Sequence, residues 1–426
     1  MNYFVKPGKK IYGEIECAGD KSISHRLALL GALASGDTII RNYCTGQDFQ
    51  STLHCLAQLG VQHESSNNSI IVHGVGLHGL SATNSVLDAG NSGTTIRLLT
   101  GILAAQKFAS TITGDDSLIQ RPMKRIIEPL SLMGAQIEAR KNNFPPLSIR
   151  GTELKPVSYI LPVGSAQVKS AILLAALYAK GVTKIYDPFN SRNHTENLLP
   201  LFNAELHTEN GWISLQNPAT MKGINYMVPG DFSSAAFFIS AALLLNNSSL
   251  LIRNVGLNPT RTGLLKVLHS MGAVIPLIKE YDIGNEMTGD FSVSSSELAS
   301  ITVDNTIVPS IIDELPLLAV LATKAHGLTI VKDAKELRYK ETDRIKTITD
   351  NLTAIGIQIN ELKDGFTLKG PQTIIGGTVD SYGDHRIAMA MAIAGIASQE
   401  GIMIKNTECI NISNPQFFTI LNDILQ

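Results

Sequence analysis

The chain contains six segments in which apolar residues, many of them small, recur on every side of a would-be helix. A surface helix of a globular protein keeps a polar face, so a helix that is apolar all round must be enclosed by other structure. We therefore predict six buried helices, five of which run through a Gly or polar turn into β-rich sequence such as residues 38–43 and 328–331. The predicted helices span residues 24–34, 92–105, 165–179, 233–245, 311–325 and 384–398.

A second pattern, Leu-x-x-hydrophobic-Gly or a variant of it, recurs between these segments and marks the ends of amphipathic helices. Gly or Asn at its last position suits a left-handed C-cap, and a strand-like stretch of alternating residues follows, for example residues 136–139. The capping residues are Gly60, Gly134, Asn203, Gly272 and Gly356. Together the two patterns predict a unit of buried helix, strand, amphipathic helix and two strands that is repeated six times.

The length of the chain indicates how these repeats are grouped. A chain of 426 residues is too long for one ordinary core and fits two domains of about 200 residues each. Six repeats then divide into three per domain, with a crossover near residues 228–231, where the sequence reads Val-Pro-Gly-Asp. We predict an N-terminal domain of residues 20–228 and a C-terminal domain made of residues 1–19 and 229–426.

Charge and hydropathy exclude several classes of function. The chain has 35 Lys and Arg residues against 37 Asp and Glu residues and only 6% aromatic residues, so it lacks an overall electrostatic footprint for nucleic acid. The first ten residues lack the apolar stretch of a signal peptide. The longest apolar runs, such as residues 235–245, fall well short of the roughly 20 residues that span a bilayer. We expect a cytoplasmic monomer with small-molecule substrates that binds neither nucleic acid nor membrane.

The sequence does not indicate a metal or a nucleotide cofactor. Its four cysteines form no C-x-x-C pair, which disfavours a disulfide framework or a zinc site. The four histidines between residues 54 and 78 lack the i, i+4 spacing of a metal-binding helix, and we interpret them as loop and surface residues. Residues 74–79 match G-x-G-x-x-G, but no helix follows and no acidic residue stands about 20 positions on, as a dinucleotide fold requires. We predict neither metal nor cofactor.

The starts of the predicted buried helices carry short polar residues. Three of these starts read Lys21-Ser-Ile-Ser-His-Arg26, Gly164-Ser-Ala-Gln167 and Gly383-Asp-His-Arg386. Free backbone N–H groups and the helix dipole at such ends attract phosphates and carboxylates. If both domains point three such ends at one another, the cleft between them binds anions without a Walker motif.

Five separated motifs carry a resemblance to a known family. They are residues 21–26 (Lys-Ser-Ile-Ser-His-Arg), 87–97 (Leu-Asp-Ala-Gly-Asn-Ser-Gly-Thr-Thr-Ile-Arg), 120–123 (Gln-Arg-Pro-Met), 337–344 (Leu-Arg-Tyr-Lys-Glu-Thr-Asp-Arg) and 384–389 (Asp-His-Arg-Ile-Ala-Met). In these motifs and in their order the chain resembles the 5-enolpyruvylshikimate-3-phosphate synthase family, from Lys6 to about Phe418. The resemblance implies an α/β fold in the form of a two-domain inside-out α/β barrel, with three repeats per domain and the active site in the interdomain cleft.

The resemblance also implies the reaction. The family transfers the enolpyruvyl group of phosphoenolpyruvate to the 5-hydroxyl of shikimate 3-phosphate and releases phosphate through a tetrahedral intermediate. This step belongs to the shikimate pathway, which leads to chorismate and the aromatic amino acids, and the family is the target of glyphosate.

Site residues follow by resemblance, motif by motif. Positions that hold shikimate 3-phosphate are Lys21, Ser22, Arg26, Ser165, Ala166, Gln167, Arg192, Asp313 and Lys340. Positions that hold phosphoenolpyruvate are Lys21, Gly93, Arg121, Gln167, Arg344 and Arg386. Guanidinium groups suit both ligands, because they bind phosphate and carboxylate with two parallel hydrogen bonds.

Four of the implied residues carry the chemistry. Asp313 resembles the base near the 5-hydroxyl, and Glu341 and Lys21 resemble the proton-transfer pair. The alternative for Asp313 and Glu341 is a helix cap and a structural salt-bridge partner. His385 has either a role in the site or a structural contact.

One departure and two competing functions remain at this point. Many family members carry a Lys before Thr-Phe-Pro near the end, whereas residues 411–415 read Asn-Ile-Ser-Asn-Pro, which removes one expected cation on the phosphoenolpyruvate side. The nearest alternative is the sister enolpyruvyl transferase that acts on UDP-N-acetylglucosamine, which commonly has a Cys in the loop that here reads Gly114-Asp-Asp-Ser-Leu-Ile-Gln-Arg121. The other alternative is a non-catalytic anion-binding protein on the same fold, which would not need Asp313 and Glu341.

Overall fold

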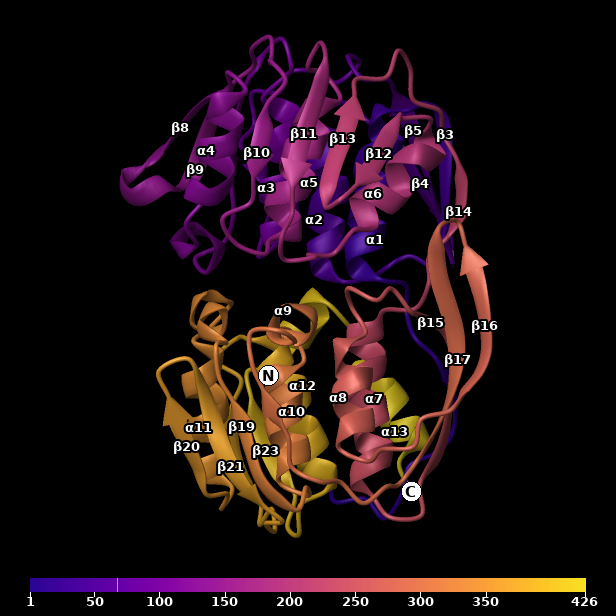
Figure 1. Cartoon of the computed structure of the whole chain (residues 1–426), viewed down its shortest axis with the longest axis vertical. Coiled ribbons are helices and arrows are strands. Elements are labelled where there is room, and N and C mark those ends of the chain that lie inside the picture. The colour runs from indigo at the N-terminus through magenta and orange to yellow at the C-terminus, as the bar shows by residue number, and fades with distance from the viewer. Residues whose placement is uncertain (67) are drawn as a thin grey trace. The chain divides into compact units, whose positions relative to one another are not determined.

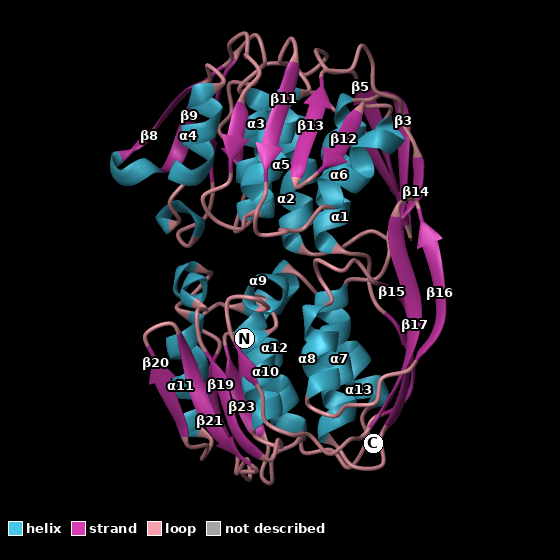
Figure 2. Ribbon diagram, viewed as in Figure 1, coloured by secondary structure: helices cyan, strands magenta, loops and turns pink. Residues whose placement is uncertain are grey.

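All six predicted apolar segments are helical in the computed structural model, which describes residues 1–66 and 68–426 (Figure 2). The buried helices are α1 (Lys21–Leu33), α3 (Gly93–Leu103), α5 (Ala166–Ala176), α7 (Phe232–Leu244), α10 (Leu315–Ala322) and α12 (His385–Ile396). In α7, for example, every residue except Ser234 is buried. The prediction from all-round hydrophobicity is therefore confirmed.

The fifth segment differs from the prediction in one respect. A continuous helix over residues 311–325 was expected, but α9 (Val308–Ile311) stops and α10 restarts at Leu315. The cause is Pro316, which has no N–H group and would clash with the carbonyl of Ile312 inside a continuous helix. A proline is tolerated in the first turn, so the helix begins anew just before it. Asp313 consequently lies in the turn between the two helices.

The chain divides into two compact units (Figure 1). Unit 1 comprises Met1–Ala18, Pro229–Asp282 and Met287–Gln426, and unit 2 comprises Gly19–Val228 and Ile283–Glu286. Residues 283–286 form the turn of a hairpin, and they pack in unit 2 although their neighbours on both sides belong to unit 1. Within unit 2, Tyr226 Oη donates to the Ile283 carbonyl at 2.9 Å, and His194 Nδ1 lies 2.7 Å from Glu286 Oε1.

Unit 2 holds three of the repeats, each with its own four-stranded sheet. The sheet orders are β14-β3-β5-β4, β6-β7-β9-β8 and β10-β11-β13-β12, with the first pair parallel and the others antiparallel. Besides α1, α3 and α5, the elements are β3 (Ser35–Arg41), α2 (Gln47–Gln58), β4 (His63–Ser66), β5 (Ser69–Val75), β6 (Leu87–Asp88), β7 (Ala109–Thr113), α4 (Lys124–Leu132), β8 (Gln136–Arg140), β9 (Phe144–Arg150), β10 (Ser158–Ile160), β11 (Val182–Tyr186), α6 (His194–Leu198), β12 (Leu206–Glu209), β13 (Trp212–Gln216) and β14 (Asn225–Met227).

Unit 1 repeats this plan, but its last sheet is completed by the start of the chain. The orders are β16-β17-β15-β2, β18-β19-β21-β20 and β1-β23-β22. Besides α7, α9, α10 and α12, the elements are β1 (Tyr3–Val5), β2 (Tyr12–Glu16), β15 (Ser249–Gly256), α8 (Gly263–Ser270), β16 (Leu277–Ile283), β17 (Glu286–Ser294), β18 (Thr302–Val303), β19 (Gly327–Val331), α11 (Arg344–Ala354), β20 (Ile359–Leu362), β21 (Gly365–Gly370), β22 (Gly377–Asp380), β23 (Ile402–Lys405) and α13 (Phe417–Ile424).

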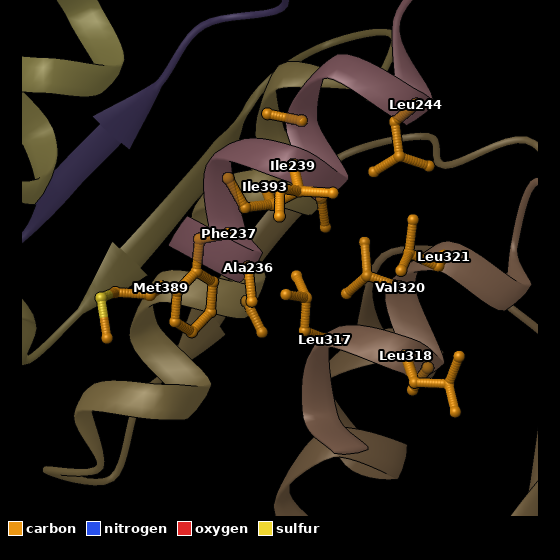
Figure 3. Close-up of a cluster of buried hydrophobic side chains, with 14 of the residues drawn as sticks. Ala236, Phe237, Ile239, Leu244, Leu317, Leu318, Val320, Leu321, Met389 and Ile393 are labelled. Carbon is orange, nitrogen blue, oxygen red and sulfur yellow. The ribbon is translucent and has the colours of Figure 1, made fainter. Parts of the chain in front are cut away.

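The core of unit 1 lies where α7, α10 and α12 pack against one another (Figure 3). Phe237 and Ile239 of α7 approach Leu317 of α10 and Met389 and Ile393 of α12. Burying a large apolar side chain stabilises a fold by about 1.5–3 kcal/mol. Such a cluster therefore holds the three helices, and with them their N-terminal ends, in fixed positions. Small residues such as Ala236 allow the close approach.

The predicted caps, the cysteines and the apolar runs can also be compared with the structure. The five predicted C-capping residues, Gly60, Gly134, Asn203, Gly272 and Gly356, all have the positive φ of the left-handed region, as expected. All four cysteines are buried thiols. In the part of the chain that the structure describes, no helix is both long and apolar enough to cross a membrane.

Candidate active site

The start of α1 places three of the predicted residues in unit 2. Asp20 caps this helix, since its Oδ1 accepts a hydrogen bond from Ile23 N at 2.9 Å. Lys21 stands in the first turn and donates from Nζ to Asp48 Oδ2 at 2.8 Å. Arg26, one turn further on, is buried, and its Nη1 donates to the Ser22 carbonyl at 3.0 Å. The two cations therefore hold fixed positions at one helix end.

The starts of α3 and α5 are linked by hydrogen bonds between their side chains. Arg97 Nη1 donates to Gln167 Oε1 at 2.7 Å, and Gln167 Nε2 donates to Thr94 Oγ1 at 3.0 Å. These bonds bring Gln167, in the first turn of α5, beside Gly93 at the start of α3. A Cβ atom built on Gly93 would lie 2.5 Å from Arg97 Nη1, so there is no room for a methyl group unless Arg97 moves.

Arg121 lies close to the same helix start. It directly follows a short 3₁₀ turn over Leu118–Gln120, and its Nη2 donates to Asn91 Oδ1 at 2.8 Å. Its Nη1 would lie 3.6 Å from a Cβ atom on Gly93. Of the predicted phosphoenolpyruvate residues of unit 2, Gly93, Arg121 and Gln167 are thus grouped at the start of α3, whereas Lys21 lies at the start of α1. Arg192, in contrast, belongs to the loop between β11 and α6 and is half-buried there.

A buried polar chain lies behind these helix starts. His25 Nδ1 lies 2.7 Å from Thr52 Oγ1, which lies 2.7 Å from Thr95 Oγ1, and Thr95 Oγ1 donates to Ser92 Oγ at 2.8 Å. Burial, reinforced by the positive charges of Lys21 and Arg26, lowers the pKa of His25 well below its usual value. His25 is therefore neutral at pH 7 and acts as a hydrogen-bonding link between α1 and α2.

In unit 1 the predicted residues gather around the buried guanidinium of Arg344. Its Nη2 donates to Glu341 Oε2 at 2.6 Å, and its Nη1 donates to Asp313 Oδ1 at 3.3 Å. Lys340 Nζ lies 3.4 Å from the same Asp313 oxygen. Burial alone lowers the pKa of Arg344, but the charges of Asp384, Glu341 and Asp313 raise it overall, so the group keeps its positive charge.

Asp384 connects this cluster to the start of α12. It is fully buried, and it accepts from Arg344 Nε at 2.8 Å and from Nη2 at 3.3 Å, a two-pronged contact. It also caps α12, because its Oδ1 accepts from Arg386 N at 2.9 Å. His385 is buried as the first residue of the helix, and Arg386 Nη1 lies 3.9 Å from Glu314 Oε1.

The predicted residues thus form two groups, one within each unit. Cations at helix ends dominate unit 2, whereas unit 1 combines cations with the carboxylates of Asp313 and Glu341. Phosphate and carboxylate ligands suit both groups. Among the described residues, no group of three or more His, Cys, Asp or Glu side chains is placed to hold a metal ion.

Sequence analysis assigned no role to three residues that the structure connects to these groups. Asp48 binds Lys21, Arg97 binds Gln167, and Asp384 binds Arg344. A signal was present for two of them, because Arg97 stands one helical turn after Gly93 and Asp384 stands at the N-cap position of a predicted buried helix. Nothing in the sequence marked Asp48 as the partner of Lys21.

Comparisons with known proteins confirm the resemblance and the fold. Residues 5–421 match the model of the family described as EPSP synthase (3-phosphoshikimate 1-carboxyvinyltransferase). The 3-phosphoshikimate 1-carboxyvinyltransferase of Petrotoga mobilis is 51% identical, with 100% of this chain and 99% of the relative covered, and that of Thermoanaerobacter sp. strain X514 is 47% identical, with 98% and 99% covered. A solved EPSP synthase from Acinetobacter baumannii has a TM-score of 0.89 and 42% identity, covering 100% of this chain and 98% of the other.

Proposed function

The chain belongs to the EPSP synthase (3-phosphoshikimate 1-carboxyvinyltransferase) family, and we propose that the two residue groups carry out that reaction on one pair of substrates. The enzyme transfers the enolpyruvyl group of phosphoenolpyruvate to the 5-hydroxyl of shikimate 3-phosphate, in the shikimate pathway. The observation that carries the assignment of roles is the Arg344 cluster, which holds two carboxylates next to two cations. A non-catalytic anion-binding protein would not need Asp313 and Glu341 there.

In the first step the substrate hydroxyl oxygen bonds to C2 of phosphoenolpyruvate while the methylene carbon C3 gains a proton. We assign removal of the hydroxyl proton to Asp313, whose side chain is largely buried between Lys340 and Arg344. Glu341, held by Arg344 at 2.6 Å, delivers a proton to C3 together with Lys21. In the second step the C2–O bond to phosphate breaks, C3 returns a proton, and phosphate leaves. Arg344 and Arg386 stabilise the negative charge that grows on the leaving phosphate.

Substrate binding is divided between the predicted domains. We propose that residues 20–228 mainly hold shikimate 3-phosphate, through Ser22, Arg26, Gln167 and Arg192, and that residues 1–19 and 229–426 supply the catalytic carboxylates. Arg26 supports this role, because it is buried and held by hydrogen bonds to Thr195 Oγ1 and the Ser22 carbonyl. A preorganised cation loses less freedom when it binds an anion than a mobile one does.

The proposal is tested by measuring phosphate release from phosphoenolpyruvate and shikimate 3-phosphate. Asp313→Asn and Glu341→Gln keep the side-chain shape but remove the acid–base group, so we expect turnover to fall by roughly 10²- to 10⁴-fold. Calorimetry should show that both variants still bind shikimate 3-phosphate. The matched control is Glu361→Gln, which neutralises a carboxylate of the same unit in a pair with Arg338 on the surface.

Each alternative function has its own outcome in this assay. Phosphate release that requires UDP-N-acetylglucosamine would identify the sister transferase. Tight binding of shikimate 3-phosphate without phosphate release would identify an anion-binding protein. Near-normal turnover in Asp313→Asn or Glu341→Gln would remove that residue from the catalytic list.

We also infer a monomer that works in the cytoplasm. Four buried thiols suit a reducing compartment. Light scattering of the purified protein should give a mass near 45.8 kDa. A dimer mass would refute the monomer, and recovery of the protein from a secreted fraction would refute the compartment.

A further inference from the structure

Lys169 is a buried lysine to which sequence analysis gave no role. It lies in α5, two residues after Gln167, and its side chain is only 2% exposed. A buried ammonium group is costly unless every donor is paired. Nζ has three partners: Asp187 Oδ2 at 2.9 Å, Glu196 Oε1 at 2.7 Å and the Ser191 carbonyl at 2.9 Å. An ammonium has three N–H donors, so all of them are used.

These partners lie at both ends of one short segment, residues 187–196. Asp187 follows β11, and Glu196 stands in the first turn of α6. Asp187 also accepts from Ser191 N at 2.9 Å and from Ser191 Oγ at 2.6 Å, which folds the segment back on itself. Arg192 is the next residue along the chain. Lys169 therefore fixes the segment before Arg192, the segment after it, and the carbonyl that immediately precedes it.

The same segment is tied to Arg26. Arg26 Nε donates to Thr195 Oγ1 at 2.7 Å, and Arg26 Nη2 donates to Ser170 Oγ at 2.7 Å. Ser170 Oγ and Thr195 Oγ1 lie 2.6 Å apart. Ser170 is the residue after Lys169, and Thr195 is the residue before Glu196. Two guanidinium groups that we assign to shikimate 3-phosphate thus depend on one buried cluster.

The charges of this cluster show that Lys169 holds its two carboxylates together. Burial alone raises the pKa of Asp187, but the charge of Lys169 and the hydrogen bonds from Ser191 hold it below its usual value, so the carboxylate stays charged. Glu196 has a second oxygen, Oε2, that is buried without a hydrogen-bond partner. Without Lys169, the two buried carboxylates would therefore repel each other, and the segment would open.

We propose that Lys169 is a positioning residue, which holds residues 187–196 in the conformation in which Arg192 and Arg26 bind the anionic groups of shikimate 3-phosphate. This inference rests on the proposed function of the site. If Lys169 acts in this way rather than as general structural support, its loss should weaken the binding of shikimate 3-phosphate much more than that of phosphoenolpyruvate. The cluster holds Arg26 and the segment that carries Arg192, both assigned to shikimate 3-phosphate, whereas Arg121 binds Asn91 beside the start of α3.

The test compares Lys169→Met with Lys169→Arg and with the control Lys180→Met. Lys180 lies just beyond α5 and pairs with Glu153 on the surface, with 84% of its side chain exposed. For Lys169→Met we expect the dissociation constant and the KM of shikimate 3-phosphate to rise at least about tenfold, which corresponds to about 1.4 kcal/mol. The KM of phosphoenolpyruvate and kcat should change by less than about threefold. Lys169→Arg should recover part of the affinity, and Lys180→Met should match the wild type.

If Lys169→Met does not fold, as circular dichroism would reveal, Ser191→Ala takes its place. That change removes one hydroxyl donor to Asp187 and leaves the ion pairs intact, so a loss of about threefold in shikimate 3-phosphate affinity is expected. Unchanged affinity in a folded Lys169→Met or in Ser191→Ala, or an equal loss for both substrates, would overturn the inference. A wild type that neither binds shikimate 3-phosphate nor releases phosphate would instead refute the proposed function.

Discussion

Replacing Gly93 with alanine tests how the start of α3 shapes the pocket for phosphoenolpyruvate. The new methyl carbon would lie 2.5 Å from Arg97 Nη1, whereas carbon and nitrogen atoms in van der Waals contact are about 3.5 Å apart. The Arg97 guanidinium must therefore retreat by about 1 Å. We expect this shift to lengthen its hydrogen bond to Gln167 Oε1, now 2.7 Å long, beyond 3.5 Å.

The size of the effect follows from the bond that is lost. A buried hydrogen bond to a charged group contributes about 1.5–3 kcal/mol. Arg97 is only half-buried, so we take about 1 kcal/mol, or roughly a fivefold rise in the KM of phosphoenolpyruvate. In this family, glyphosate reaches further into the pocket than phosphoenolpyruvate does. The methyl group should therefore weaken the binding of glyphosate more than that of phosphoenolpyruvate. We expect wild-type enzyme to be inhibited and the inhibition constant to rise at least about tenfold, or 1.4 kcal/mol.

A double-mutant cycle separates the steric route from others. In an Arg97→Met background the hydrogen bond to Gln167 is already absent, so adding Gly93→Ala should change the KM of phosphoenolpyruvate by less than about twofold. Steady-state phosphate release at varied phosphoenolpyruvate and glyphosate gives all the constants required. The same fivefold effect in both backgrounds would show that the methyl group does not act through Arg97. Equal glyphosate inhibition of wild type and variant would show that the assignment of Gly93 to this pocket is wrong.

Three further predictions concern stability and titration. The unfolded chain protonates His25 near pH 6.5, while the fold keeps it neutral. The unfolding free energy of the wild type should therefore fall as the pH falls below about 6.5, by up to about 1.4 kcal/mol per pH unit. In urea unfolding, His25→Gln should lose less unfolding free energy than the wild type between about pH 7.5 and 5.5, and identical losses would contradict the buried neutral state. A Cβ atom on Gly101 would lie 2.3 Å from the Ala171 carbonyl oxygen. Gly101→Ala should therefore force α3 and α5 apart and lower the unfolding free energy by about 1–3 kcal/mol. An unchanged midpoint of urea unfolding would refute this overpacking. The hydrogen bond that His73 donates to Asp37 raises the pKa of His73, so an NMR titration should place that pKa above 6.5. Asp37→Asn should return it toward that value, and a His73 titration that Asp37→Asn leaves unaltered would refute the pairing.

The repeat could be predicted from sequence because it depends on local chemistry. Buried helices show themselves by apolar residues on every side, and caps such as Asn203 show themselves by the left-handed backbone that Gly and Asn tolerate. The helix break before Leu315 has an equally local cause, Pro316, which is visible in the sequence. The prediction missed it because apolar residues flank the proline on both sides. Patterns of this kind need no knowledge of which segments meet in space.

The partners of charged residues could not be predicted in the same way. Lys169 reaches Asp187 and Glu196 across 18 and 27 positions, and Arg344 reaches Asp384 across 40. A charged residue in a sequence reads first as a solvated one, and only the packing of distant segments shows that it is buried and paired. The family motifs named most of the site residues, but the contacts that hold them in place came from the structure.

The hairpin turn at residues 283–286 has a consequence for the order in which the protein is made. When the ribosome has completed residue 228, nearly all of unit 2 has been synthesised, and domains generally begin to fold as they emerge. His194 is then without Glu286, the carboxylate that it faces in the finished protein, since that residue is added 58 positions later. Unit 1 can complete its folding only later, because β1 (Tyr3–Val5) pairs with β23 (Ile402–Lys405), which is synthesised after the other strands of the unit. A nascent chain must therefore keep β1 from pairing wrongly until β23 has been synthesised.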